Sequence, residues 1–446
     1  MFDMDKWLNE RRITEVECLV PDMSGIARGK ILPSSKFVRS QVDNSLRLPE
    51  SIFTQTVTGE FVDSDVTDPV EPDVILRPDP TTLSIVPWYT EPTAQVVCDA
   101  FDRKGKPVPI APRQVLRQVI DLYAARGWKA LVAPELEFYL VAKNVDPDYP
   151  LQPPIGRSGR PETGRQSYGI DAVNEFDPIF EDIYKYCDVQ GLDVDTLIHE
   201  GGTAQVEINF NHSEPLTMAD QAFLFKRTVR QAALKHDMYA TFMAKPHENE
   251  PGSSMHIHQS VMDMKTGKNI FASKDGAQSK LFLNHIGGLQ RYLAAALSLC
   301  APNVNSYRRL VPESDAPTNV HWAVDNRTVS LRVPSSDASN TRVENRVPGA
   351  DANPYLAFAA SLACGYLGMI ERIKPSEPVT GSAYRYAHTL PISLDESLDK
   401  LNYTKALKQV LGEKFCEAYN DVKYEEMQNY RRVISSWERE YLLLNV

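Results

Sequence analysis

A short run of alternating charged and apolar residues leads into the longest uncharged stretch of the chain. Arg342-Val343-Glu344-Asn345-Arg346 predicts a strand with its three charged side chains on one face, because side chains alternate along a strand. The 16 residues from Tyr355 to Ile370 carry no charge and fall short of the roughly 20 that span a bilayer. They predict a buried helix. A strand beside it would hold a carboxylate between two guanidiniums, which suits a metal-bound polyanion. For such a run alone, a surface ladder of ion pairs is the commoner meaning.

Charge balance and cysteine usage limit the partners of the chain. Its 446 residues carry a formal net charge of -11, so the overall charge repels nucleic acid and anionic membranes and suits a small cationic partner. The six cysteines lie far apart without a C-x-x-C pair, which argues against a zinc ribbon or a disulfide framework. The N-terminal residues lack the basic and apolar regions of a signal peptide. We therefore expect a cytoplasmic protein that binds neither nucleic acid nor membranes.

The chain is long enough for two domains. Residues 1–108 contain short strand-like segments separated by turn-forming residues, near 15–21, 26–32, 73–76, 83–86 and 94–98. Residues 109–446 begin with a helix near 113–126 and a strand near 130–141, and a Pro-, Gly- and Arg-rich loop follows at 144–168. Later helices are expected near 219–236, with Thr217 and Asp220 as a capping pair, and from Ser393 to the end. The pattern predicts an α+β protein with a small β-rich domain and a large second domain.

Acidic residues and histidines recur at alternate positions of segments that predict strands. Each of them alone would most often belong to a solvated strand face or an ordinary core. Together, several acids in apolar strands would repel one another unless cations neutralised them, because each buried charge costs several kcal/mol. Carboxylates with an imidazole suit Mg²⁺ or Mn²⁺ better than zinc. The residues concerned are Glu135, Glu137, Glu200, Glu207, His256, His258 and Glu344.

Several arginines accompany these ligands in the sequence. Guanidiniums beside Mg²⁺-type ligands are what phosphoryl transfer requires, since the protein mainly positions and screens charge on the transferring group. Neither a G-x-x-x-x-G-K-[ST] loop nor the protein-kinase signature set is present, which argues against those two folds. The arginines are Arg309, Arg327, Arg332, Arg342 and Arg346.

In these motifs the chain resembles the glutamine synthetase family, and the resemblance extends over nearly its whole length. The resemblance implies a β-grasp-like N-terminal domain and a catalytic domain of curved antiparallel strands with flanking helices. It also implies ATP, two or more Mg²⁺ or Mn²⁺ ions per active site, and a homo-oligomer of stacked rings, a dodecamer, with active sites between neighbouring subunits. The matching blocks are Glu135 to Phe138, His199 to Ile208, Phe242 to Pro246, Gly252 to His258, Asn305 to Pro312 and Arg342 to Pro354.

The resemblance also implies a role for each candidate residue. One metal ion would be held by Glu137, Glu200 and Glu207, and the other by Glu135, His256 and Glu344. The carboxylate of glutamate would be clamped by Arg309 and Arg346, with the Gly252 backbone near its amino group. The contacts with ATP fall on His258, Ser260, Arg332 and Arg342. Arg327 would lie on the transferring phosphoryl group, and the catalytic base of the flap falls on Asp315.

The departures from the family pattern lie where the nitrogen substrate would bind. The ammonia-using enzymes carry an Asp-Gly-Ser-Ser segment, whereas this chain has Leu48-Pro49-Glu50-Ser51-Ile52-Phe53. In the flap, Glu313-Ser314-Asp315-Ala316-Pro317 replaces Gly-Tyr-Glu-Ala-Pro, and the shorter Asp315 leaves room for a larger nucleophile. Both variants resemble the γ-glutamylpolyamine synthetase branch, which implies ligation of glutamate to putrescine, spermidine or a similar polyamine in polyamine catabolism. Candidate acids for the distal ammonium groups are Glu50, Glu60, Asp63, Asp65 and Glu313.

Three other functions remain open at the level of sequence. An ammonia-using glutamine synthetase would be favoured by an acidic ammonium site, which the chain lacks. A ligase for a monoamine such as methylamine or ethanolamine fits the same residues. A non-catalytic homologue would have lost metal ligands, and all six predicted ligands are present.

Overall fold

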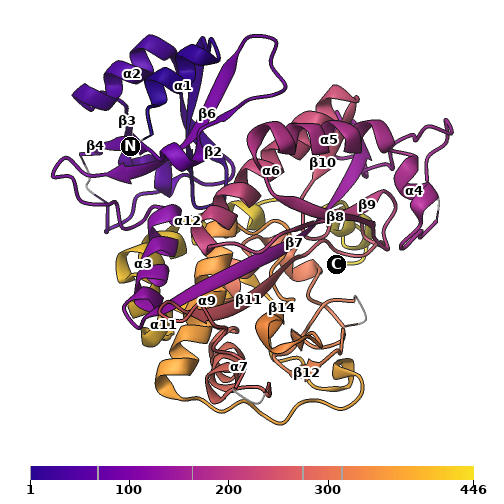
Figure 1. Cartoon of the computed structure of the whole chain (residues 1–446). Helices are drawn as coiled ribbons and strands as arrows, with labels where there is room; N and C mark the ends of the chain where they lie inside the picture. Colours follow the sequence, from indigo (N-terminus) through magenta and orange to yellow (C-terminus); the bar gives the residue numbers. More distant parts are fainter. Residues whose placement is uncertain (1, 68–69, 163, 274–275, 313–314) are drawn as a thin grey trace.

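Two β-sheets organise the computed structural model, which describes residues 2–67, 70–162, 164–273, 276–312 and 315–446 (Figure 1). The first sheet belongs to the N-terminal part of the chain and the second to the remainder. The α+β class expected from the sequence is confirmed. Among the described residues, no helix has both the length and the hydropathy that crossing a membrane would require.

The N-terminal sheet joins six strands in the described residues, in the order β2-β1-β6-β4-β3, with β5 paired to β6. Strands β1 and β6 run parallel, and the other neighbours are antiparallel. Two helices that the sequence did not predict, α1 (Met4–Glu10) and α2 (Ser34–Asp43), accompany this sheet. The strands are β1 (Glu15–Pro21), β2 (Ala27–Pro33), β3 (Arg47–Pro49), β4 (Asp73–Pro78), β5 (Ser84–Ile85) and β6 (Thr93–Phe101).

The second sheet has the order β12-β13-β14-β11-β7-β9-β8, and β10 pairs with β7. Its neighbours are antiparallel except β12 and β13, which run parallel. The longest of these strands, β7, lies between β9 and β11 and pairs with both of them (Figure 1). The strands are β7 (Trp128–Ala142), β8 (Val194–His199), β9 (Gln205–Phe210), β10 (Met238–Thr241), β11 (Met255–Asp263), β12 (Trp322–Val324), β13 (Leu331–Val333) and β14 (Val343–Asn345).

The two faces of this sheet differ in character because side chains alternate along β7. Phe138 points to an apolar face and packs against Phe225 of α6 (Pro215–Lys235), with ring centroids 6.5 Å apart. Glu135 and Glu137 therefore point to the opposite face. The helices that flank the sheet and complete the chain are α3 (Pro112–Ala124), α4 (Ile170–Asn174), α5 (Asp177–Gln190), α7 (Lys280–Tyr292), α8 (Leu297–Cys300), α10 (Leu394–Tyr403), α11 (Lys405–Leu411), α12 (Glu413–Arg431) and α13 (Ser436–Tyr441).

The uncharged stretch forms α9 (Pro354–Glu371), and its residues from Pro354 to Met369 are buried, as predicted. Its small residues allow α7 to approach closely. A Cβ atom on Gly368 would lie 2.2 Å from the carbonyl oxygen of Asn284, and one on Gly288 would lie 2.3 Å from that of Cys364. The Ala- and Gly-rich composition is therefore a requirement of helix packing.

The predicted capping pair of α6 is wrong. The helix begins at Pro215, two residues before Thr217, and its N-cap Glu214 makes no capping hydrogen bond. Asp220 instead accepts hydrogen bonds from Arg113 of α3 and from Tyr355 of α9. A buried guanidinium holds this carboxylate more strongly than a helix terminus would.

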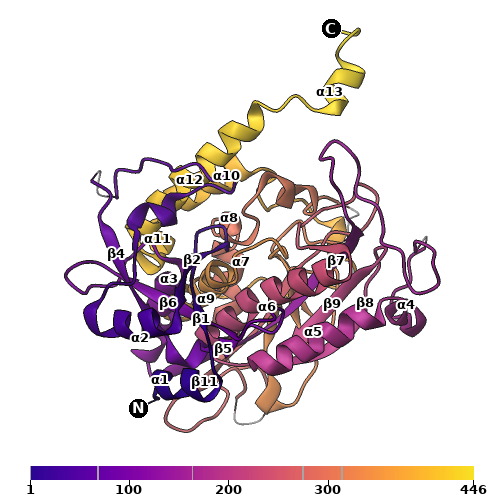
Figure 2. The same ribbon diagram turned by 90° about the horizontal axis from the view of Figure 1, so that it is seen from above.

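The C-terminal segment leaves the body of the molecule. Figure 2 shows α13 projecting beyond α12, away from both sheets. The C-terminal segment, from Val433 to Val446, includes α13 and carries large apolar side chains that are exposed in the isolated chain. These are Val433, Ile434, Trp437, Tyr441, Leu442, Leu443, Leu444 and Val446.

Candidate active site

The strand register brings the predicted acids and histidines into one row across the sheet. Glu137 lies opposite Glu207 of β9, and Glu135 lies opposite His256 of β11. Directly opposed residues of an antiparallel pair share a face, so the row continues from strand to strand. On β11, the next residue of that face is His258, which lies opposite Glu344, and Glu344 in turn lies opposite Arg332.

Two of the carboxylates hold protons unusually tightly. Burial raises the pKa of Glu207 to about 9, and the charges of Glu135, Glu137 and Glu200 add to this effect. Burial likewise raises the pKa of Glu200, which follows β8, to about 7, with Glu137 as the next cause. Crowded carboxylates of this kind fit divalent cations, because a cation would remove both the repulsion and the need for protons.

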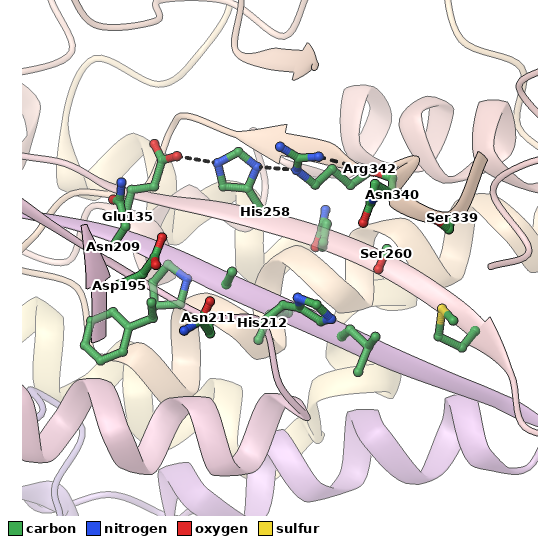
Figure 3. A pocket seen from close by; sticks show the side chains of 17 residues that line it. Glu135, Asp195, Asn209, Asn211, His212, His258, Ser260, Ser339, Asn340 and Arg342 are labelled. Carbon is green, nitrogen blue, oxygen red and sulfur yellow. Dashed lines mark hydrogen bonds and ion pairs between the residues drawn. The ribbon is translucent and has the colours of Figure 1, made fainter. Parts of the chain in front are cut away.

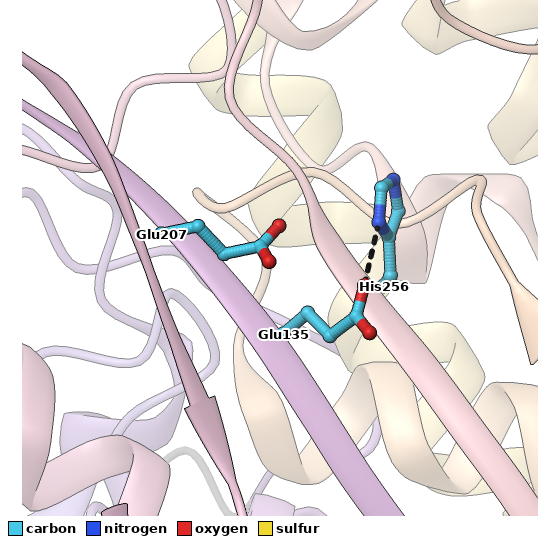
Figure 4. Close-up of side chains that lie close together, drawn as sticks. All are labelled: Glu135, Glu207 and His256. Atoms are coloured by element: carbon cyan, nitrogen blue, oxygen red, sulfur yellow. Dashed lines mark hydrogen bonds and ion pairs between the residues drawn. The ribbon is translucent and has the colours of Figure 1, made fainter. Parts of the chain in front are cut away.

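Glu135 is held in the opposite way, by two histidines. Its carboxylate lies 2.7 Å from Nε2 of His258. It also lies 3.3 Å from Nδ1 of His256, as Figure 4 shows. Burial would raise the pKa of Glu135, but the hydrogen bonds with His256 and His258 outweigh burial and hold the pKa well below its usual range. This side chain is therefore the ionised centre of the row.

Two sets of three side chains place possible ligand atoms within 4.8 Å of one another. One set is Glu135, Glu207 and His256, and the other is Glu135, His258 and Glu344. Both are drawn almost wholly from the predicted metal ligands, although His258 was expected to contact ATP. These sets contain four of the six expected ligands, namely Glu135, Glu207, His256 and Glu344, whereas Glu137 and Glu200 are in neither set. The metal ligands and their division between two ions stay a prediction.

Glu344 does lie between two guanidiniums, but one of them is not the arginine that the sequence suggested. The fully buried Glu344 carboxylate bonds Arg332 at 2.8 Å and Arg346 at 2.5 Å. Arg342 instead donates to Nδ1 of His258 at 3.2 Å. Arg332 comes from the neighbouring strand β13, and a local pattern could not reveal that pairing.

The carboxylate cavity, about 350 Å³ in volume, opens on the polar face of the sheet. Its wall includes the end of the loop that the sequence placed near a site, at Ser167 and Tyr168. The predicted residues that line it are Glu135, Glu137, Glu200, Glu207, Gly252, His256, Arg309, Asp315, Arg327, Arg332 and Arg346.

The histidine cavity, about 390 Å³ in volume, adjoins the first and shares Glu135 and Asn209 with it. Figure 3 shows Glu135, His258 and Arg342 in one connected line at its edge, with Ser260 beside them on β11. Three of the four residues expected to contact ATP line this cavity, namely His258, Ser260 and Arg342, whereas Arg332 lines the carboxylate cavity.

Gly252 and Arg309, two of the residues expected to bind glutamate, line the carboxylate cavity and contact each other. Arg309 donates to the carbonyl oxygens of Val347 and Arg346, at 2.8 and 3.0 Å, and burial lowers its pKa to about 10. A Cβ atom on Gly252 would lie 2.7 Å from the carbonyl oxygen of Ala244 and as close to the Arg309 side chain. Only glycine therefore fits at position 252, between the Ala244 carbonyl group and the Arg309 side chain.

Some contributors were not among the predicted site residues. Ser254 donates to Glu137 through its backbone at 2.8 Å and through its hydroxyl at 2.5 Å, and Gln205 donates to the same carboxylate at 3.2 Å. Both residues stand in motifs that the sequence already singled out, so their spacing was the available signal. Asn209, Ser254 and Pro251 also line the carboxylate cavity.

Four of the five acids suggested for a distal ammonium group lie in the described part of the chain, and none of these four lines either cavity. Glu60 accepts a hydrogen bond from Asn429 of α12, so it faces the C-terminal helices. Glu50, Asp63 and Asp65 also belong to the N-terminal part of the chain and are not among the lining residues of either cavity. Glu313 lies outside the described residues.

Comparisons with known proteins agree with this geometry. Residues 109–442 match the family model described as glutamine synthetase, catalytic domain. The γ-glutamylputrescine synthetase PuuA of Escherichia coli (strain K12) is 35% identical over 438 residues, covering 96% of this chain and 92% of that protein. The glutamate–isopropylamine ligase of Pseudomonas sp is 33% identical over 442 residues, covering 97% and 95%. The structure of a GmaS/ADP complex covers 99% of this chain and 100% of that chain, with a TM-score of 0.86 at 26% identity. The chain belongs to the glutamine synthetase family.

Proposed function

We propose that this protein is an ATP-dependent ligase that joins the γ-carboxylate of glutamate to an amino group of a polyamine, such as putrescine or spermidine. The observation that carries the proposal is the row of metal-type ligands flanked by arginines, set between two adjoining cavities that share Glu135. We assign the histidine cavity to the nucleotide and the carboxylate cavity to glutamate. The similarity to enzymes named for putrescine and isopropylamine favours an organic amine as the acceptor.

Divalent cations fit the donors of this site. Mg²⁺ or Mn²⁺ would be held by Glu135, Glu137, Glu200, Glu207, His256 and Glu344, and when bound would neutralise phosphate charge during transfer. His258, Ser260 and Arg342 would bind ATP in the histidine cavity, and the related GmaS has been solved with ADP. Arg332 would contact the phosphates at the junction between the cavities.

The chemistry requires activation of an unreactive carboxylate, whose leaving group would otherwise be oxide. Transfer of the γ-phosphoryl group of ATP to the glutamate side chain gives γ-glutamyl phosphate, with Arg327 screening the transferring charge. The amine nitrogen then attacks the carbonyl carbon, and the bond to phosphate breaks. Asp315 takes the proton that the nitrogen loses. Arg309 and Arg346 would hold the α-carboxylate throughout.

The proposal extends to the assembly and the division of the chain. The exposed apolar segment of α13 supports a homo-oligomer, because a contiguous apolar surface of this kind marks an interaction site (Figure 2). We place it in stacked rings, a dodecamer, in which the N-terminal acids of one subunit could reach the site of its neighbour. The separate sheets support a boundary between residues 1–108 and 109–446.

The experiment that tests the activity is phosphate release from ATP in the presence of glutamate and Mg²⁺, with one amine at a time. The expected result is release that requires glutamate and is fastest with putrescine or spermidine. Ammonia-dependent release that exceeds release with every organic amine would contradict the acceptor assignment. No glutamate-dependent release with any amine would contradict the proposed reaction itself.

A further inference from the structure

A third cavity lies between the turn that joins β1 to β2 and the C-terminal half of α6, away from the candidate active site. It has a volume of about 500 Å³, which is within the range of small-molecule sites. Four cationic side chains line it, and the acidic lining is limited to Asp351 within the described residues. We call it the junction cavity. The cationic residues are Lys226, Arg227, Arg230 and Lys423.

Two of these cations are already neutralised by acids. Arg227 forms an ion pair with Glu17 at 2.5 Å, and Lys423 forms one with Glu426 at 2.7 Å. These pairs need no further partner. They leave Lys226 and Arg230 as the charges that a ligand could meet.

Lys226 and Arg230 form no direct ion pair within the described residues, although the charge of Asp351, which lines the same cavity, acts on Lys226. The ammonium group of Lys226 is buried and donates to the carbonyl oxygen of Ala352 at 2.7 Å. Both charges lie beside the ring of Phe242, at 5.6 Å for Lys226 and 5.1 Å for Arg230. A buried ammonium without a carboxylate in direct contact is costly. Burial lowers the pKa of Lys226 to about 7, with the Arg230 charge as the next cause and the Asp351 charge acting in the opposite direction.

Arg230 differs from Lys226 because it is an exposed residue. Its side chain is accessible to solvent, yet burial by the surrounding protein lowers its pKa. A guanidinium held in this way can still donate two parallel hydrogen bonds to a carboxylate. The remaining wall is largely apolar and includes Phe223, Phe242, Met243 and Pro302. An apolar wall of this kind suits the carbon skeleton of an organic ligand better than it suits an inorganic oxyanion.

We propose that the junction cavity binds a small organic carboxylate, with Arg230 and Lys226 as its charge partners. The bound molecule would lie behind the wall of the carboxylate cavity. Asn303, which lines the junction cavity, begins the segment that leads to Arg309, and the chain continues from Met243 to the Ala244 carbonyl beside Gly252. The site is separate from the substrate positions and does not depend on the proposed acceptor.

The test is calorimetric titration of succinate into the full-length protein with ADP, Mg²⁺ and glutamate already present, so that the substrate cavities are filled. The expected result is one succinate per chain, with binding weakened about ten- to a hundred-fold by Arg230→Gln, the loss expected for one charge-assisted contact. Lys235→Gln, on the same helix but paired with Asp182 outside the cavity, should bind as the unmodified protein does. Arg230→Gln should keep its glutamate-dependent phosphate release, which shows that the variant is folded.

Four results would overturn the proposal. These are no succinate binding, binding that Arg230→Gln leaves unchanged, binding lost in Arg309→Gln, and inorganic phosphate binding in preference to succinate. The third would place succinate in the substrate site. Sedimentation completes the test, because dissociation of the assembly by Arg230→Gln without succinate binding to the unmodified protein would make the cavity a contact between subunits.

Discussion

At the scale of single residues, the site is defined by charges that the fold forces together. Glu137 and Glu207 lie opposite each other on paired strands, Glu135 is hydrogen-bonded to two histidines, and Glu344 forms ion pairs with two arginines. The sheet thus holds one part of the row ionised and balanced and leaves the other part crowded. A divalent cation would bind most favourably in the crowded part, because neighbouring carboxylates repel one another and raise one another's pKa.

The crowding predicts a pH dependence of stability in the metal-free protein. The pKa of Glu207 is raised to about 9 and that of Glu200 to about 7, from an ordinary value of 4.5. From about pH 5 to about pH 9, the folded protein holds protons that the unfolded chain has released, so the free energy of unfolding falls as the pH rises. Urea unfolding of EDTA-treated protein should show this fall, and Mg²⁺ should reduce it.

Two variants check that prediction. Glu207→Gln should reduce the dependence, most of all above about pH 7, because it removes the one of the two groups that has the higher pKa. Glu440→Gln, on the exposed helix α13, should leave it unchanged. A free energy of unfolding that rises with pH in this range would contradict the account of the crowded carboxylates.

Asp315 provides a second prediction at this scale. Asp315→Asn keeps the size of the side chain and removes the base, so amide formation should fall by about 10²- to 10⁴-fold. Glutamate-dependent release of phosphate in the absence of amine should fall much less, since phosphoryl transfer does not use this carboxylate. Rapid-quench measurement of both steps compares them directly. An equal loss in both would remove Asp315 from its role as base.

At the scale of elements, Arg113 joins α3 to both parts of the chain. Its buried guanidinium bonds Asp79 and Asp99 of the N-terminal part, at 2.7 and 2.6 Å, and Asp220 of α6 at 2.8 Å. Arg117 bonds the same two N-terminal acids from a position that is 35% exposed. The two arginines therefore offer a matched pair of variants on one helix.

Arg113→Met should lower the free energy of unfolding by about 3–5 kcal/mol, because it leaves the buried carboxylate of Asp220 without its cationic partner. Arg117→Met should cost less than about 1 kcal/mol, since water screens its ion pairs. Urea unfolding in the presence of Mg²⁺ measures both. Equal effects of the two substitutions would show that burial does not set the strength of this junction.

The elements also show what the sequence could reveal. The alternation in β7 and β9 predicted both strands and the face of their acids, because that signal is local. The local sequence pattern does not show which strands become neighbours, so it could not place Arg332 beside Glu344. The capping role of Asp220 failed for the same reason, since its partner Arg113 lies 107 residues away. The short helices α1 and α2 were missed because each offers only two or three turns of pattern.

At the scale of the whole molecule, α13 and the residues that follow it project from the body of the chain (Figure 2). Trp437 is 61% exposed and Leu443 is 74% exposed, so burial against another subunit would remove considerable apolar surface from water. Leu443→Asp should therefore shift the protein to smaller species in sedimentation velocity. Glu440→Gln on the same segment should not, and an unchanged distribution for both would contradict the role of α13 in assembly.

The central claim concerns the whole site acting on its acceptor, and competition tests it most directly. Purified protein would receive ATP, glutamate, Mg²⁺ and an equimolar mixture of ammonium, methylamine, isopropylamine, ethanolamine, putrescine and spermidine. Mass spectrometry of the γ-glutamyl products then reports the ratios of kcat/KM among the acceptors. The account predicts that γ-glutamyl polyamines dominate from the first turnovers. A mixture dominated by glutamine, or by the amide of a monoamine, would contradict it.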